Sequence, residues 1–152
     1  MADGIEAVKQ VLSQWMDDPD ADHPYLLSIE RFGDYRAGEE EWLDPDVELD
    51  FAAGTARLPG LDTHGRGREE FWRLWRGWLE AWSEYRMGYS NWEQRGEAVI
   101  VDLDVVASGK LSGAPASLSN TQIWIMRGGR IASLRMFPSR RAALAALEGG
   151  PS

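Results

Sequence analysis

The sequence predicts an α+β domain in which helices come first and then cover one side of a bent, mostly antiparallel sheet. Residues 3–82 carry apolar side chains mainly at helical spacing, with one alternating segment at 43–51. Residues 83–137 instead alternate apolar and polar side chains in successive segments separated by turn sequences. The chain has 152 residues, which suits a single domain with its own hydrophobic core.

Helical periodicity justifies the first elements. Apolar residues from Ile5 to Met16 recur every three or four positions and predict an amphipathic N-terminal helix. The expected strand at 43–51 is indicated by alternation, because Val47, Leu49 and Phe51 alternate with acidic residues. The expected order before residue 68 is a helix at 3–17, a link at 17–24, helical pieces at 24–32 and 36–43, a strand at 43–51 and a loop at 52–67.

A tryptophan-rich segment, REEFWRLWRGWLEAW at 68–82, predicts a further amphipathic helix. Phe71, Trp75, Trp78 and Trp82 fall on one stripe of such a helix. Two interpretations stay open: the stripe packs against the sheet as core, or it offers an aromatic surface to a ligand. A curved sheet that leaves a cavity would allow both.

Strands and turns fill the second half. The turn sequence RGGR at 127–130 predicts a tight hairpin, because adjacent glycines accept positive φ. The expected elements are strands at 85–90, 99–105, 118–126 and 131–137, a turn at 94–97, a loop at 109–117, a short helix at 140–148 and a disordered tail at 146–152.

Composition excludes several classes of function. The formal net charge of −9 argues against a nucleic-acid partner, which needs a basic surface. The chain has no cysteine, so thiolate and disulfide chemistry are excluded. It has no apolar stretch of about 20 residues for a membrane span, and its acidic N-terminus does not resemble a secretory signal. Two distant histidines give no metal-ligand spacing. We therefore expect a cytoplasmic protein without metal.

Several phrases resemble the SnoaL-like branch of the nuclear-transport-factor-2-like (NTF2-like) superfamily. These are WLDPDVELDF at 42–51, GRGREEFWRLWRGWLEAW at 65–82, and the strand sequences VIVDLDVVASGK and TQIWIMRGGRIASLRMFPSR. The resemblance implies one domain over 1–152, with 1–24 as a helical N-terminal extension. It also implies a cone in which helices close over a curved sheet, an apolar pocket for a small ring-containing molecule, no cofactor, and a homodimer formed through the sheet.

Enzymes of this superfamily include isomerases, polyketide cyclases, dehydratases and epoxide hydrolases, and this chain departs from them. At the positions that match their polar working residues it carries Phe51, Leu103, Val105 and Met136. None of these side chains can transfer a proton. The departure argues against the isomerase, dehydratase and epoxide hydrolase activities in their known form.

The polar residues that remain supply the candidates for catalysis. Asp50 is next to the matched position, and a strand bulge would turn it inward; otherwise it is a solvated carboxylate. His64 is expected near the pocket mouth, where an imidazole suits acid–base catalysis, although a lone loop histidine is more often simply exposed. Asp62 could orient it.

Strand alternation supplies the candidates for ligand binding. These are Phe51, Trp75, Tyr85, Met87, Tyr89, Leu103, Asn120, Gln122, Trp124 and Met136. Asn120 and Gln122 stand out, because buried amides need hydrogen-bond partners. They lie either on a pocket floor or on a dimer or solvent face. Two functions follow: a cofactor-free lyase, isomerase, cyclase or hydrolase, or a binding protein with the same pocket and no chemistry.

Overall fold

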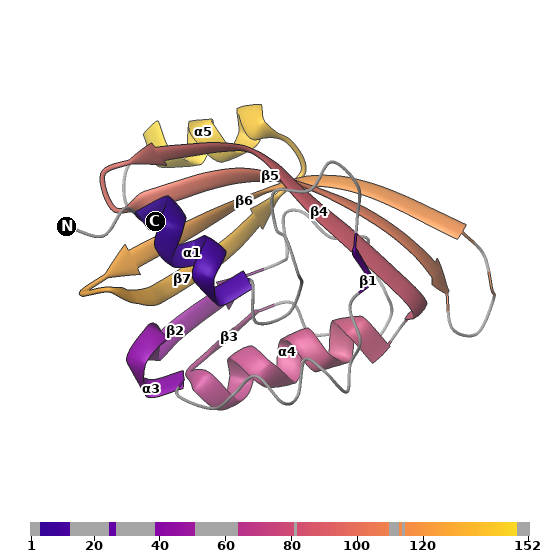
Figure 1. Cartoon of the computed structure of the whole chain (residues 1–152), viewed down its shortest axis with the longest axis horizontal. Helices are drawn as coiled ribbons and strands as arrows, with labels where there is room; N and C mark the ends of the chain where they lie inside the picture. Colours follow the sequence, from indigo (N-terminus) through magenta and orange to yellow (C-terminus); the bar gives the residue numbers. More distant parts are fainter. Residues whose placement is uncertain are drawn as a thin grey trace.

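A computed structural model describes residues 4–12, 25–26, 39–50, 64–80, 82–109, 113 and 115–148. The described strands form one seven-stranded sheet in the order β1-β4-β5-β6-β7-β2-β3. The sheet bends over α4, with α1 and α3 on the same side and α5 on the other (Figure 1). The predicted α+β fold, a curved and mostly antiparallel sheet covered by helices, is confirmed.

The elements have the following bounds. They are α1 (Gly4–Leu12), β1 (Tyr25–Leu26), α3 (Glu39–Trp42), β2 (Leu43–Asp50), β3 (His64–Arg66), α4 (Arg68–Glu80), β4 (Trp82–Arg95), β5 (Ala98–Gly109), β6 (Pro115–Arg127), β7 (Arg130–Phe137) and α5 (Arg140–Glu148).

An antiparallel meander of β4, β5, β6 and β7 forms the centre of the sheet. The predicted turn between β6 and β7 is present, and Gly128 and Gly129 both have positive φ, 62° and 79°. Strand β2 joins the far side of β7 in parallel, and β3 pairs with β2 as the edge. This arrangement brings the middle of the chain beside its last strand.

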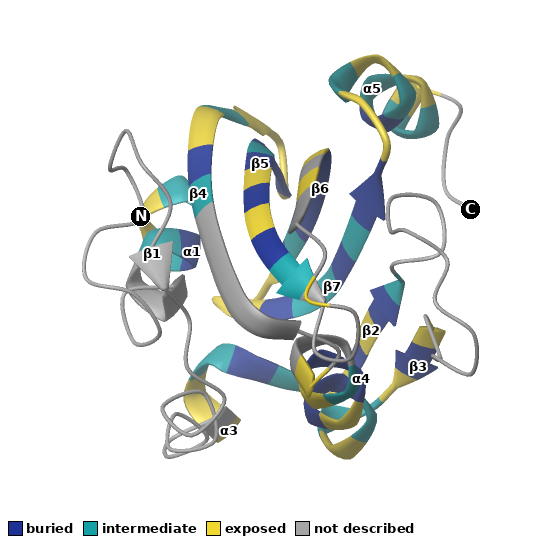
Figure 2. Ribbon diagram, turned by 90° about the vertical axis from the view of Figure 1, so that its right-hand side faces the viewer, coloured by how far each residue is buried: buried dark blue, intermediate teal, exposed yellow. Residues whose placement is uncertain are grey.

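The two faces of the sheet carry separate hydrophobic cores. Buried and more exposed positions alternate along parts of the strands, as in β5 (Figure 2). The concave face, toward α1 and α4, buries a large apolar cluster that includes Leu49, Val101 and Trp124. The convex face buries a smaller cluster that includes Ile100 and Ala143 beneath α5. Outside the register shifts, alternation along each strand therefore assigns the described side chains to one face or the other.

The tryptophan-rich helix α4 packs against the concave face, as the core interpretation predicted. Trp72 and Trp75 are 4% and 0% exposed, whereas Arg73 on the opposite side of the helix is exposed. Its first turn is tied to β2, because the Arg68 guanidinium donates two hydrogen bonds to the Leu43 carbonyl at 2.9 and 2.7 Å. The N-terminal end of α4 is thus fixed to β2.

Several boundaries differ from the sequence predictions. Tyr25–Leu26, expected in a helix, pairs with β4 as a strand, and His64–Arg66, expected in a loop, forms β3. Trp82 begins β4 and so does not continue the helical stripe. Residues 115–117 belong to β6 and not to a loop, and α5 includes 146–148, which were assigned to a disordered tail. In each case pairing or packing with a distant segment overrides the local pattern.

Candidate functional site

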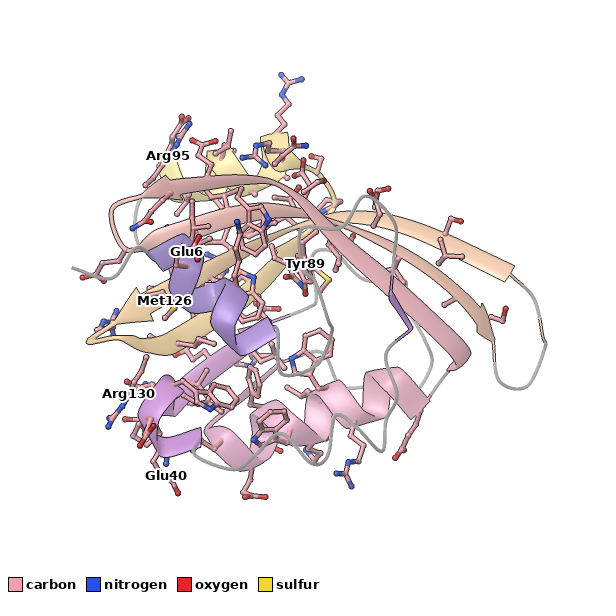
Figure 3. All side chains as sticks on the ribbon, in the orientation of Figure 1. Glu6, Glu40, Tyr89, Arg95, Met126 and Arg130 are labelled. Atoms are coloured by element: carbon pink, nitrogen blue, oxygen red, sulfur yellow. The ribbon has the colours of Figure 1, made fainter. Side chains whose placement is uncertain are left out.

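The ligand-binding candidates gather on the concave face. In register, Tyr89 lies opposite Leu103, Leu103 opposite Asn120, and Gln122 opposite Met136. Each of these residues is at most 7% exposed, as are Trp75 and Trp124. Figure 3 shows Tyr89 on the side of the sheet that faces α1 and α4. Tyr85 and Met87 occupy the same backbone row, opposite Ala107 and Val105, and Phe51 lies outside the described residues.

The two catalytic candidates, Asp50 and His64, lie together but on the other face. Asp50 is the cross-strand partner of His64 on β3 and of Arg135 on β7. Its neighbour Leu49 is paired with Leu134 and fully buried on the concave side, so alternation turns Asp50 outward. His64 is exposed. Asp62, considered as its orienting group, lies outside the described residues.

Gln122 is the most unusual polar group of the concave face. Its side chain is 0% exposed, and its Oε1 accepts a hydrogen bond from Trp124 Nε1 at 3.0 Å. An indole N–H can only donate, so the contact fixes which end of the amide is oxygen. The Nε2 end is buried and has no hydrogen-bond partner in the part of the chain that the structure describes. The Gln122 side chain therefore places an N–H donor, unpaired among the described residues, inside the apolar core.

Trp92 is a concave-face residue that the sequence analysis missed. Strict alternation after Tyr89 would turn Asn91 inward, but the pairing of β4 with β5 shifts between Ser90 and Glu93. Asn91 adopts a left-handed φ of 57° and donates from Nδ2 to Asp102 Oδ2 on the convex face at 2.8 Å. This bulge turns the next residue, Trp92, toward the concave cluster. Asparagine tolerates this backbone conformation, which was the available signal.

The indole of Trp92 lies between Tyr89 and the N-terminal helix. Its ring centroid is 5.8 Å from that of Tyr89 and 5.2 Å from Lys9 Nζ on α1. Its Nε1 is buried and lacks a hydrogen-bond partner among the described residues. On α1, Val8 is fully buried in the same cluster, so this helix closes one side of the concave face.

Polar side chains on the convex face form a separate network with its own partners. Burial of Asp102 acts to raise the pKa of its carboxyl, but hydrogen bonds from Asn91, Thr121 and Arg140 outweigh that effect and hold the pKa below its usual value. Arg140 also binds Glu93 at 2.9 Å and, with Arg95, lowers the pKa of that carboxyl. This network ties α5 to the sheet. Asp102 is half-buried within it.

Two hollows lined by described residues also lie on the convex side. One of about 610 Å³ runs between β2 and α5, and its charged groups face one another, as in the pair of Arg66 and Glu48 at 3.8 Å. The other, of about 310 Å³, is lined by the Asp102 and Arg140 network. In both, charges of the chain itself oppose each other, so neither favours a ligand of one charge.

Neither a candidate metal centre nor a membrane-spanning helix is found among the described residues. Within the described ranges, no group of three or more histidine, cysteine or acidic side chains could hold a metal ion. None of the helices in those ranges has the length and apolar character that crossing a membrane requires.

Comparison with known families decides the relationship. A sequence model of the SnoaL-like domain matches residues 33–134, which is more than half of the chain. This chain belongs to the SnoaL-like domain family. The predicted resemblance to the SnoaL-like branch of the NTF2-like superfamily is confirmed. No curated protein matches the sequence closely enough to count as a relative.

Solved structures show the same fold for this SnoaL-like domain. An NTF2-like protein of unknown function from Burkholderia pseudomallei is 16% identical, with a TM-score of 0.67 and coverage of 95% of this chain and 97% of that one. TerC, co-crystallized with polyporic acid, is 20% identical, with a TM-score of 0.62 and coverage of 95% and 98%. A candidate SnoaL-like polyketide cyclase from a Jannaschia species is 14% identical, with a TM-score of 0.65 and coverage of 97% and 93%.

Proposed function

We propose that this SnoaL-like domain binds a small, apolar, ring-containing molecule against the concave face of its sheet, with Gln122 donating a hydrogen bond to an oxygen of that molecule. The observation that supports the proposal is the buried Nε2 of Gln122, which has no partner among the described residues. Side chains around it supply an apolar surface, because Val101 and Met136 are its cross-strand neighbours.

The Nε2 of Gln122, unpaired among the described residues, carries a free-energy cost that a bound ligand could remove. A buried N–H without a partner costs about 1–3 kcal/mol, so native structures keep few of them unless they serve a purpose. A carbonyl, enolate or phenolate oxygen at Nε2 would remove that cost on binding. Since Trp124 already holds Oε1 at 3.0 Å, the amide would not have to reorient. Pre-organisation of this kind favours affinity.

Binding without catalysis is the form of the function that we favour. The concave side chains described here are apolar, aromatic, amide or phenol groups, and the two candidates for proton transfer, Asp50 and His64, pair on the opposite face. The enzyme hypothesis, a cofactor-free cyclase, isomerase or dehydratase, stays a prediction that would need a proton-transfer group from outside the described residues. The cytoplasmic location is likewise an expectation.

Isothermal titration calorimetry tests the proposed binding. We would titrate polyporic acid, 1-tetralone and naphthalene, and repeat the titrations with Gln122→Met, which keeps the side-chain length and removes the donor. We expect saturable binding of at least one ring compound, and a loss of about fivefold in affinity for the ketone in the variant, the effect of one hydrogen bond. Naphthalene, which has no acceptor, is the control and should not change.

Two outcomes would contradict the proposal. If none of the compounds binds, the concave face does not serve as a binding site. If 1-tetralone binds the variant and the parent equally, Gln122 is not the anchor. Retention of the far-ultraviolet circular dichroism spectrum would show that the variant is folded.

The homodimer expected through the sheet also remains a proposal. Val106 of β5 is the one large apolar side chain strongly exposed among the described residues, at 48%, and register places it on the convex face beside Ser117. A single exposed valine is ordinary on a protein surface, so the dimer proposal rests on the family resemblance. Sedimentation velocity would test it, and a purely monomeric mass at micromolar concentration would contradict it.

A further inference from the structure

Two buried hydrogen-bond donors that flank Val101 on the sheet have no partner among the described residues. They are Gln122 Nε2 on β6 and Trp92 Nε1 at the bulge of β4. Trp92 packs against the buried apolar cluster of the concave face. Gln122 is the cross-strand partner of Val101, which belongs to that cluster. A single orphan donor is a modest cost, but two at one level of the sheet indicate a shared purpose.

The register places these donors on either side of Val101. Val101 of β5 is the cross-strand partner of Gln122, and the bulged pair Asn91 and Trp92 lies between the β4 positions that pair with Asp102 and Ile100. Neighbouring strands are about 4.8 Å apart, so the backbones of β4 and β6 are separated by about 10 Å here. Val101 is a small side chain, fully buried between them.

We infer that Trp92 and Gln122 form a two-point donor site, and that this site selects flat ring compounds with acceptor oxygens on opposite edges, such as diketones, quinones and their enolates. The inference rests on the proposed function and narrows its ligand class. An indole N–H has no acceptor, and the acceptor of Gln122 is occupied by Trp124. A ligand hydroxyl that had to donate would find no partner at either point, so carbonyl and anionic oxygens are preferred.

The N-terminal extension gains a role from this arrangement. Lys9 of α1 lies 5.2 Å above the centre of the Trp92 ring, and the Ile5 amide donates to Gln94 of β4 at 3.4 Å. A cation over the face of an indole is attracted to it and holds the ring in place. Helix α1 therefore positions the Trp92 donor, and its positive charge favours an anionic oxygen at this end of the site.

Calorimetry with three matched probes tests the inference. The probes are 1,4-naphthoquinone with two opposed oxygens, 1-tetralone with one, and naphthalene with none. The chain lacks cysteine, so thiol addition to the quinone does not interfere. We expect affinity to rise by about fivefold with each oxygen, the effect of one hydrogen bond. Trp92→Phe, which keeps a ring and removes the N–H, should abolish the step from one oxygen to two and leave naphthalene unchanged.

Trp72→Phe is the control, because Trp72 is a buried concave-side indole of α4 that makes edge-to-face ring contacts with Trp42 and Phe71. This variant should leave the ratios between the affinities for the three probes unchanged. Equal affinity of 1,4-naphthoquinone and 1-tetralone for the parent protein, or a quinone affinity that Trp92→Phe does not change, would overturn the two-point site while leaving the proposed binding function intact. Failure of all three probes and of polyporic acid to bind would instead overturn the proposed function.

Discussion

Gln122 and Trp124 act as one unit at the scale of single residues, because each satisfies the other on a face that excludes water. Gln122→Met leaves Trp124 Nε1 without its acceptor, and Trp124→Phe leaves Gln122 Oε1 without its donor. Each single change therefore creates a new orphan, at about 1–3 kcal/mol. The double change creates none.

We therefore expect the two substitutions to be non-additive. The double variant should be more stable than the sum of the single effects by about 1–2 kcal/mol, as is typical of residues that share one hydrogen bond. Urea unfolding of the four proteins measures this coupling directly. Strict additivity would show that the hydrogen bond is absent in solution.

At the scale of elements, the regular strands were predictable and the irregular ones were not. Alternation placed Leu103, Gln122 and Met136 on one face, and the register agrees. It could not foresee the bulge at Asn91, since one extra residue reverses the phase of every later position. For the same reason the sequence missed Trp92. Short strands such as β3 depend on pairing with β2, which no local pattern encodes.

Gly65 shows how closely α4 lies on β3. A methyl group at this position would be 2.8 Å from Leu74 Cδ1 and 3.0 Å from Glu70 Cβ. We expect Gly65→Ala to lower the free energy of unfolding by about 1–3 kcal/mol, because the helix must move away. In the Leu74→Ala background the same change should cost less, since the nearest atom is gone. An equal cost in both backgrounds, measured by urea unfolding, would contradict this packing.

Helix α5 is held to the sheet by the Arg140 network, and its contribution should depend on pH. A lowered pKa of Asp102 in the folded state means that its stabilisation is complete above the ordinary carboxyl range and is lost as the pH falls through the folded value. Arg140→Gln should therefore lower the free energy of unfolding by about 1 kcal/mol at pH 7 and by less at pH 3.

Arg141→Gln provides the matched control for this experiment, because Arg141 is an exposed arginine on the same helix. It should change stability little at either pH. Urea unfolding at both pH values checks the difference. If Arg140→Gln destabilises the protein equally at pH 7 and pH 3, the ionised carboxylates are not its working partners.

The whole molecule couples binding to stability, because the ligand would sit between elements that meet only in the folded state. Helix α1 packs on β4 and β5, while α4 packs on β2, and Gln122 lies on the strand that separates these regions. A ligand that binds the folded state alone raises the free energy of unfolding by about 2.7 kcal/mol at one hundred times its dissociation constant. For a chain of 152 residues, this corresponds to a rise of about 5–10 °C in Tm.

The size of this rise in Tm should depend on the hydrogen-bond donor of Gln122. At one fixed concentration of 1-tetralone, Gln122→Met should show a smaller rise in Tm than the parent protein, since its affinity is lower. Differential scanning calorimetry measures both shifts, with the Tm of each protein without ligand as its own reference. A rise of the same size in both proteins would mean that the ligand stabilises the fold from another surface, such as the hollow beside α5.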